Sequence, residues 1–109
     1  MISWEDFERL DMRIGTIIEA IPFEKAKKPA YKLKIDFGEK GIKNSSAQIT
    51  MLYQPGELVG KQIIAVINFP PKQIANYMSE CLVLGVYNED NDVILLQPER
   101  HTGNGNKIG

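Results

Sequence analysis

The sequence holds a single cysteine and a single histidine. Cys81 cannot form an internal disulfide, and it begins an apolar stretch with no second cysteine or histidine nearby. We therefore interpret Cys81 as a small buried side chain rather than a reactive thiol. His101 stands alone in a polar stretch and cannot supply a zinc site. The sequence predicts no metal site and no cofactor.

Long apolar runs are also missing. The two longest, residues 62–68 and 81–87, are far shorter than the roughly 20 residues that cross a bilayer. The N-terminus carries acidic residues where a secretory signal needs a basic stretch followed by an apolar one. We expect a cytoplasmic protein that does not insert into membranes.

No arrangement of residues typical of catalysis is present. The sequence lacks a paired-carboxylate motif and a glycine-rich phosphate loop, and it offers no nucleophile with a histidine partner. We predict that the chain is not an enzyme.

What the sequence does have is the composition of an ordinary globular domain. Its 109 residues are 43% hydrophobic and 25% charged, which suits a single domain with one modest core. We expect one folding unit over residues 1–109, with a helix within residues 1–10 and a polar, flexible tail at residues 100–109.

A short amphipathic helix is expected at the N-terminus. Ser3 is a suitable cap, and the acidic residues that follow it favour a helix start. Trp4, Phe7 and Leu10 are spaced so that they share one face of two helical turns. This face needs a surface to cover it, and we expect it to be buried between two copies of the chain.

The next three segments have the character of β-strands. Residues 11–21 are rich in β-branched side chains, and Gly15 in their middle predicts a bulge or a tight bend. Residues 31–37 alternate strictly, with apolar side chains facing one way and charged side chains facing the other. Residues 42–50 form a plausible third strand that is polar and rich in serine.

The rest of the chain completes a small barrel. Residues 55–60 predict a one-turn helix, and residues 93–96 predict a final short strand. Residues 62–68 and 81–87 show no alternation, so both faces of each strand should be covered. This inventory predicts an all-β fold, a five-stranded OB-fold barrel with a short N-terminal helix and a short helix between strands three and four. A small β-sandwich or an SH3-like barrel fits the same pattern.

Charge is unevenly distributed along the chain, although its net value is only −1. Residues 25–43 carry seven lysines and two acids, whereas residues 80–99 carry five acids and no base. An OB-fold forms its backbone-binding groove where this lysine segment lies, and lysine suits phosphate contacts. The segment predicts either a nucleic-acid surface or an ordinary solvated face.

Residues 68–79 join the two most apolar strands and mix apolar side chains with amides and a hydroxyl. Two adjacent prolines hold part of this loop extended. It can present Phe69, Ile74, Tyr77 and Met78 to an apolar peptide, because methionine adapts to varied partners. Packing of the loop on its own barrel explains the pattern equally well.

Several motifs resemble the tRNA-binding domain family, which occurs alone and attached to some aminoacyl-tRNA synthetases. They lie, in order, at residues 11–17, 31–38, 57–61 and 66–84. The motifs at residues 26–33, 44–50, 68–74 and 79–80 resemble the CsaA branch of this family in particular. The resemblance covers about residues 7–99 and depends on the order and spacing of these motifs.

The resemblance implies an OB-fold that binds tRNA through shape and backbone, as a homodimer in the free-standing members. For the CsaA branch it further implies a chaperone that holds unfolded preproteins and hands them to the secretion machinery. The positions carried over to the nucleic-acid face are Lys32, Lys34, Ser46, Asn68, Lys72 and Ser79.

The chain departs from the wider family in two places. The family tends to have a more basic loop and a Ser-x-Gly-Met tetrad, whereas here the loop contains Gln73, Ala75 and Asn76 and the tetrad positions are residues 79–82. Fewer positive charges and an added Glu80 should weaken phosphate binding, so we expect modest, salt-dependent tRNA affinity. Peptide binding is therefore our first expectation, and the two functions can coexist on different faces of one dimer.

Overall fold

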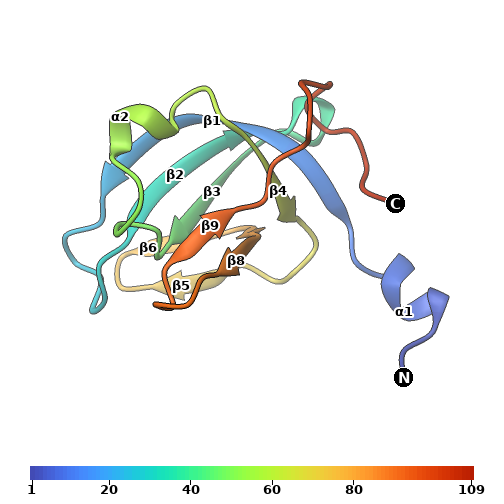
Figure 1. Ribbon diagram of the computed structural model, residues 1–109, viewed down its shortest axis with the longest axis horizontal. Helices are drawn as coiled ribbons and strands as arrows, with labels where there is room; N and C mark the ends of the chain where they lie inside the picture. The colour runs from blue at the N-terminus through green and yellow to red at the C-terminus, as the bar shows by residue number, and fades with distance from the viewer.

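A computed structural model describes all 109 residues and shows a β-barrel with two short α-helices (Figure 1). The elements are α1 (Trp4–Glu8), β1 (Met12–Pro22), β2 (Tyr31–Asp36), the 3₁₀ turn η1 (Gly38–Lys40), β3 (Ile42–Ala47), α2 (Pro55–Leu58), β4 (Gln62–Val66), β5 (Lys72–Ile74), β6 (Tyr77–Ser79), β7 (Leu82–Val83), β8 (Gly85–Tyr87) and β9 (Val93–Leu95). Neither α1 nor α2 has the length or the apolar character that a membrane-spanning helix needs.

The largest sheet has the order β3-β2-β1-β4-β7, and each neighbouring pair of strands is antiparallel. β1 pairs with β4 through its first half and with β2 mainly through its second half. The segment before β7 closes the sheet against β3: the Glu80 amide donates to the Asn44 carbonyl over 2.8 Å, and the Ser46 amide donates to Ser79 Oγ over 3.2 Å. The predicted five-stranded OB-fold barrel, with α2 between its third and fourth strands, is confirmed.

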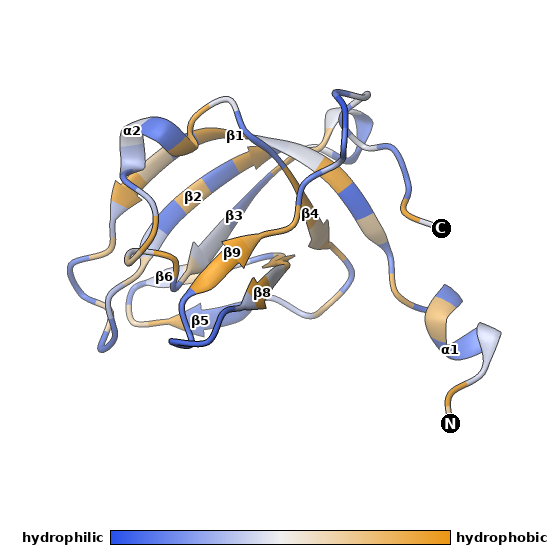
Figure 2. Ribbon diagram, in the orientation of Figure 1, coloured by the Kyte–Doolittle hydropathy of each residue, from blue (hydrophilic) through white to orange (hydrophobic).

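The alternation of residues 31–37 is confirmed, and it builds the centre of the core. Leu33, Ile35 and Phe37 are fully buried inside the barrel, whereas Lys34 is exposed on the other face of β2. Figure 2 shows this pattern as alternating blue and orange bands along β2. α2 adds Leu58, which is also fully buried. Each such side chain contributes about 1.5–3 kcal/mol of burial free energy.

The bulge in β1 lies at a different residue from the predicted one. The register with β2 shifts between Ile17 and Glu19, so the prediction of a bulge at Gly15 is wrong. Gly15 instead permits close packing, because a Cβ on it would lie 2.6 Å from a methyl carbon of Ile35 and 2.6 Å from the ring of Phe37. The core side chains, rather than a kink, require glycine at this position.

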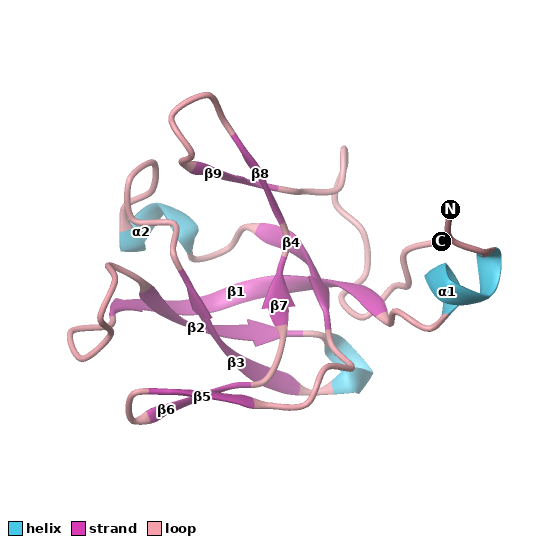
Figure 3. Ribbon diagram, turned by 90° about the horizontal axis from the view of Figure 1, so that it is seen from below, coloured by secondary structure: helices cyan, strands magenta, loops and turns pink.

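α1 is shorter than the two turns that the sequence predicts. Ser3 caps it as expected: Ser3 Oγ accepts a hydrogen bond from the Asp6 amide, and the Asp6 carboxylate accepts one from the Ser3 amide. The helix ends at Glu8 because the chain turns at Arg9 before it enters β1. No residue of α1 is buried, and the helix projects from the barrel at the same end of the molecule as the C-terminus (Figures 1 and 3).

The apolar run at residues 81–87 does not form the single covered strand that its pattern predicts. It divides between β7, which pairs with β4, and β8, which pairs with β9. The amide of Leu84 makes the last hydrogen bond of this run to β4, 2.9 Å from the Ile64 carbonyl, and the chain then leaves the barrel. As a result, Leu82 is 49% exposed and Tyr87 is 73% exposed. The expected coverage of both faces holds for β4 but is wrong for this run.

Residues 68–79, expected to be a loop, contain the β5-β6 hairpin. Lys72 lies opposite Ser79, and Ile74 lies opposite Tyr77, in the register of the two strands. The hairpin lies beside β3, on the opposite side of the sheet edge from the β8-β9 hairpin (Figure 3). Both hairpins therefore flank the segment that closes the barrel.

The C-terminal residues lie along β1 and are not the free tail that their composition suggests. The Ile14 amide donates to the Asn106 carbonyl over 3.0 Å, and the Gly105 amide donates to the Ile14 carbonyl over 2.7 Å. The Ile108 amide continues this pattern with the Met12 carbonyl, over 2.9 Å. The C-terminal segment thus occupies the edge of β1 that β2 leaves free.

Candidate functional site

Four of the six residues predicted to bind nucleic acid form one row. Lys32 lies opposite Ser46 across β2 and β3, and Lys72 lies opposite Ser79 across β5 and β6. The hydrogen bond from the Ser46 amide to Ser79 Oγ, 3.2 Å long, joins the two pairs. The row therefore runs from the barrel surface onto the β5-β6 hairpin.

Lys34 extends this row along β2, on the same face as Lys32. Its cross-strand neighbours are Glu19 on β1 and Asn44 on β3. Glu80 Oε1 accepts a hydrogen bond from the Asn44 amide over 2.8 Å, which brings a second acid to this side. These two carboxylates offset part of the positive charge around Lys34.

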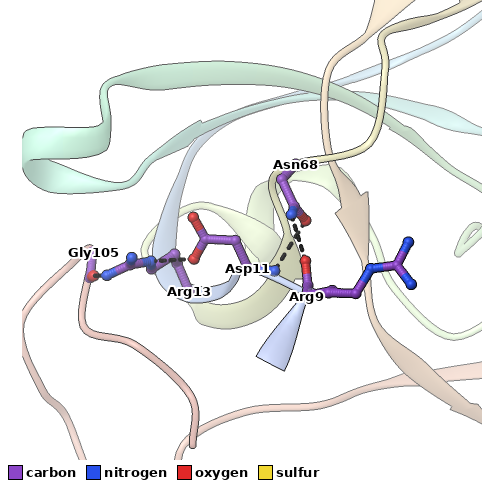
Figure 4. Close-up of polar contacts among 5 residues, drawn as sticks. All are labelled: Arg9, Asp11, Arg13, Asn68 and Gly105. Atoms are coloured by element: carbon purple, nitrogen blue, oxygen red, sulfur yellow. Dashed lines mark hydrogen bonds and ion pairs between the residues drawn. The ribbon is translucent and has the colours of Figure 1, made fainter. Parts of the chain in front are cut away.

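Asn68 lies apart from the row and is engaged with the backbone near α1. Its Oδ1 accepts a hydrogen bond from the Asp11 amide over 2.9 Å, and its Nδ2 donates to the Arg9 carbonyl over 2.7 Å (Figure 4). Arg13 continues the network, with Nε 2.6 Å from Asp11 Oδ1 and Nη1 3.1 Å from the Gly105 carbonyl. The Asn68 side chain thus fixes the connection between α1 and β1.

A groove of about 510 Å³ lies between the β5-β6 hairpin and the segment from β7 to β9. We name it the apolar groove, because its floor is the apolar stretch at residues 81–84. One wall carries Ser46, Lys72, Ile74 and Ser79, and the other carries Tyr87 and Val93. Three residues of the polar row therefore border an apolar floor.

A second depression, of about 390 Å³, lies next to the apolar groove. We name it the lysine pocket, because Lys25, Lys27 and Lys28 of the β1-β2 loop line it. Its other lining residues include Ser46, Gln48 and Ile74, which also line the apolar groove. The two depressions therefore adjoin along Ile74, with a basic side and an apolar side.

The residues predicted to bind peptide are not all brought together. Ile74 lines the apolar groove, and Phe69, which is 48% exposed, lines a smaller depression of about 370 Å³ that Lys72 also borders. Met78 lies opposite Gln73, and side chains alternate along a strand, so Met78 faces away from Ile74 and Lys72. The structure does not bring Met78 to the apolar groove.

Tyr77, the fourth predicted peptide residue, packs against the barrel. Its hydroxyl donates to the Leu33 carbonyl over 3.1 Å, and its ring meets Phe23 edge to face with 5.6 Å between centroids. The Lys32 ammonium lies 5.0 Å from the centroid of each of these two rings. Burial, reinforced by nearby carboxylates, raises the pKa of Tyr77 to about 12, so its hydroxyl stays protonated and can donate.

Sequence patterns did not reveal that Leu82 and Tyr87 line the apolar groove, nor that Phe23 contacts Lys32. Leu82 and Tyr87 belong to a run without alternation, which is the same pattern that a covered strand has. Phe23 is buried at the end of β1, and only the β1-β2 pairing and the β5-β6 hairpin bring it next to Lys32. No local sequence signal predicts that contact.

Cys81 lies in the floor of the apolar groove and is buried. Burial raises the pKa of its thiol to about 11, although a hydrogen bond from Ser45 and the charge of Lys43 lower it. Its Sγ lies 3.8 Å from the Asn44 carbonyl. Because the thiolate is the reactive form, the interpretation of Cys81 as a buried, unreactive side chain agrees with its surroundings.

The residues predicted to form a dimer interface are uncovered in the single chain. Trp4 is 82% exposed, and Phe7 and Leu10 are partly buried. Leu10 and Phe69 line a depression of about 480 Å³ between α1 and the chain that follows β4. Trp4 therefore faces outward from the barrel, whereas Leu10 lies beside the chain that follows β4.

Comparison with known proteins identifies similar domains. The family described as putative tRNA-binding domain matches residues 12–107. The crystal structure of the chaperone CsaA from Bacillus anthracis is 55% identical, with a TM-score of 0.95 over 100% of this chain and 99% of that one. The CsaA chaperone from Picrophilus torridus is also 55% identical, with a TM-score of 0.94 over the whole of both chains.

Curated relatives include much longer proteins. Methionine–tRNA ligase from Methanococcoides burtonii is 36% identical over 108 residues, which are 99% of this chain and 16% of that enzyme. The chain thus spans about one sixth of the length of the curated relatives that it matches. The similarity concerns one domain of these enzymes.

Proposed function

The chain belongs to the tRNA-binding domain family, and to its CsaA branch, and on this premise we propose that it is a dimeric chaperone that holds unfolded preproteins and also binds tRNA. In this proposal it acts in the cytoplasm as a binding protein rather than an enzyme, and passes preproteins to the secretion machinery. The alternative is a structure-specific tRNA-binding protein with no chaperone role. The lysine pocket is the observation that favours this alternative.

The observation that carries the chaperone proposal is the apolar groove. Its residues Leu82 and Tyr87 are large, apolar and substantially exposed, as a surface for unfolded segments requires. Burial of one such side chain contributes about 1.5–3 kcal/mol, so two anchors supply about 3–6 kcal/mol. Association also costs the partners their translational and rotational freedom, so this gross gain leaves only weak binding. One groove would therefore hold a chain loosely and release it readily.

A dimer would strengthen this weak binding. Two grooves on one particle can hold two segments of the same unfolded chain, which raises the overall avidity without any new contact. α1 supplies a candidate interface, because Trp4 is 82% exposed and no residue of the helix is buried. A helix of five residues is unstable alone, so contact with a second copy would also stabilise it.

tRNA binding in this proposal uses the lysine pocket and the row from Lys32 to Lys72. Mobile ammonium groups suit phosphates, and Ser46 and Ser79 can add neutral hydrogen bonds. Glu19 and Glu80 flank the row and reduce its positive potential. The affinity should therefore be modest and should fall steeply with salt.

Suppression of aggregation tests the chaperone proposal. Chemically denatured luciferase is diluted into buffer with the protein, and light scattering is followed over time. We expect the double variant Leu82→Ser, Tyr87→Ser to lose most of the suppression, because it removes the exposed apolar anchors of the groove. Met78→Ser removes an apolar side chain that is about as exposed as Leu82 and faces away from the groove, and it is the matched control. Full suppression by the double variant would reject the groove as the binding site.

Fluorescence anisotropy with labelled tRNA tests the nucleic-acid proposal. Replacing Lys25, Lys27 and Lys28 by alanine should lower the slope of log affinity against log salt by about 2–3 units, because each lost phosphate contact lowers it by roughly 0.7–0.9. Lys40→Ala removes a lysine on η1, outside both depressions, and should leave the slope unchanged. A triple variant with the parent affinity and slope would refute binding at this pocket.

Light scattering coupled to size exclusion tests the dimer. The parent should have twice the chain mass of 12.3 kDa, and Trp4→Ser should shift it towards the monomer. Met51→Ser alters another exposed apolar residue, distant in sequence from α1, and should leave the mass at the dimer value. A monomeric parent at all concentrations would exclude the dimer.

A further inference from the structure

We propose that Phe23 and Tyr77 position the ammonium group of Lys32 for a phosphate of bound nucleic acid. This inference rests on the proposed tRNA binding and adds two aromatic positioning residues to it. The Lys32 ammonium lies 5.0 Å from each ring centroid, within the range in which a ring face attracts a cation. We name this arrangement the Lys32 cage.

The cage distinguishes Lys32 from the other lysines of the basic segment. Lys25, Lys27 and Lys28 are exposed in a loop, and no aromatic ring lies under their ammonium groups. A free lysine side chain loses much rotamer freedom when a phosphate immobilises it. Lys32 is already held by two rings, so it loses less freedom on binding and should contribute more affinity per charge.

The rings are themselves held in place. Phe23 is buried, and the Tyr77 ring meets it edge to face, with 68° between the ring planes. The Tyr77 hydroxyl donates to the Leu33 carbonyl, which ties the β5-β6 hairpin to β2. The cage therefore has a fixed geometry in the free protein, as a positioning device needs.

The cage also lies at the correct place in the candidate site. Lys32 is opposite Ser46, which lines both the lysine pocket and the apolar groove. Tyr77 is opposite Ile74, which lines both depressions as well. A phosphate bound on the row would therefore lie beside the Lys32 cage.

The test separates the charge of Lys32 from its placement. Lys32→Ala removes the charge, so tRNA affinity should fall and the salt slope should decrease by about 0.7–0.9. Tyr77→Leu and Phe23→Leu keep the charge, so affinity should fall about tenfold while the salt slope stays at the parent value. Tyr77→Phe keeps the ring but loses the hydrogen bond to the Leu33 carbonyl, so its tRNA affinity should fall clearly less than that of Tyr77→Leu.

A double variant excludes a merely structural role for the ring. If Tyr77 acts through Lys32, Tyr77→Leu should weaken tRNA binding no further once Lys32→Ala is present. In the free protein, the NMR signals of the Lys32 side-chain protons next to the ammonium should be shifted by the ring currents and should return to ordinary values in Tyr77→Leu. Phe23 is buried, so Phe23→Leu can unfold the chain, and the half-buried Tyr77 then carries the test.

The possible failures are distinct. If Lys32→Ala binds tRNA with the parent affinity and slope, nucleic-acid binding at this row is rejected together with the cage. If Lys32→Ala weakens binding but Tyr77→Leu and Phe23→Leu bind like the parent, only the positioning role is overturned. If Tyr77→Leu lowers tRNA affinity by the same factor in the parent and in Lys32→Ala, the positioning role is likewise overturned. The ring would then act independently of Lys32.

Discussion

Gly15 lies where β1 passes over the core side chains of Ile35 and Phe37. A Cβ at this position would come within 2.6 Å of both side chains, a separation that requires them to move. We expect Gly15→Ala to lower the free energy of unfolding by about 2 kcal/mol, the usual cost of overpacking a tight core. Urea denaturation followed by tryptophan fluorescence or circular dichroism would measure the change.

Gly56 provides the matched control for this prediction. It lies inside α2, and a Cβ added there meets no atom within 4 Å. Gly56 has room for a Cβ and lies in the first turn of α2, so Gly56→Ala should leave the stability unchanged or raise it slightly. If both variants behave alike, contact with the core does not explain Gly15.

Cys81 makes stability depend on alkaline pH. Burial raises the pKa of its thiol from 9.0 to about 11 in the folded chain, whereas the unfolded chain ionises near the ordinary value. Between these two pH values the unfolded state loses its proton first, so the stabilising contribution is complete below pH 9 and is lost by pH 11. The loss should be on the order of 2 kcal/mol.

Comparison with Cys81→Ala isolates this titration. The Tyr77 phenol also has a raised pKa, and because it titrates in both proteins most of its contribution cancels; the charge of Cys81 is the smallest cause of that shift. The difference in unfolding free energy between the parent and Cys81→Ala should therefore change by about 2 kcal/mol between pH 9 and pH 11. A difference that is constant over that range would contradict the assignment.

The sequence predicts the direction of a side chain only where the alternation along a single strand fixes it. Strict alternation predicts that Lys32 and Lys34 point outward, and the register of β2 and β3 places Lys32 opposite Ser46. Asn68 and Phe23 depend on segments that are far apart in the chain. A resemblance between sequences can mark Asn68 as a functional position, but it does not reveal that its amide is bound to the backbone near α1.

The composition of the C-terminal segment does not predict that its backbone pairs with β1. The segment is polar and rich in glycine and asparagine, yet its backbone covers the free edge of β1. Truncation after Arg100 should remove this cover, and the Ile14 amide should then exchange its hydrogen for deuterium much faster, because its acceptor, the Asn106 carbonyl, is lost. Hydrogen exchange measured by NMR would follow this amide.

A shorter truncation is the control for this element. Removal of residues after Lys107 leaves both hydrogen bonds of Ile14 in place and takes away only the one made by Ile108. The Ile14 amide should remain protected in this variant. Equal exchange rates in the parent and in the protein truncated after Arg100 would show that the segment does not cover β1 in solution.

The strand patterns predicted the barrel but not the course of residues 81–87, which leave it after Leu84. Residues 31–37 have one apolar face, and only a half-buried strand satisfies that pattern. Residues 81–87 are apolar throughout, which fits a covered strand as well as a strand that leaves the barrel after Leu84. Pairing partners decide between these outcomes, and the partners of β8 lie in β9 rather than in the barrel. The floor of the groove was missed for this reason.

At the scale of the whole molecule, the structure changes the expected arrangement of the two ligands. The sequence allowed tRNA and peptide to bind on different faces of a dimer, but Ser46, Lys72 and Ser79 line the same groove as Ile74 and Leu82. The lysine pocket adjoins this groove along Ile74, and the two share polar residues. A phosphate backbone bound on the row would therefore cover the mouth of the apolar groove.

We therefore predict that tRNA and unfolded peptide compete for one site. A fluorescent, unfolded apolar peptide is titrated with the protein at fixed tRNA concentrations, and its apparent dissociation constant is read from anisotropy. At a free tRNA concentration ten times its own dissociation constant, the apparent peptide constant should rise about tenfold. The variant with Lys25, Lys27 and Lys28 replaced by alanine should bind the peptide normally and resist displacement, because these lysines line the pocket but not the groove. Peptide that stays bound at saturating tRNA would mean that the ligands occupy separate faces, which the sequence alone allowed.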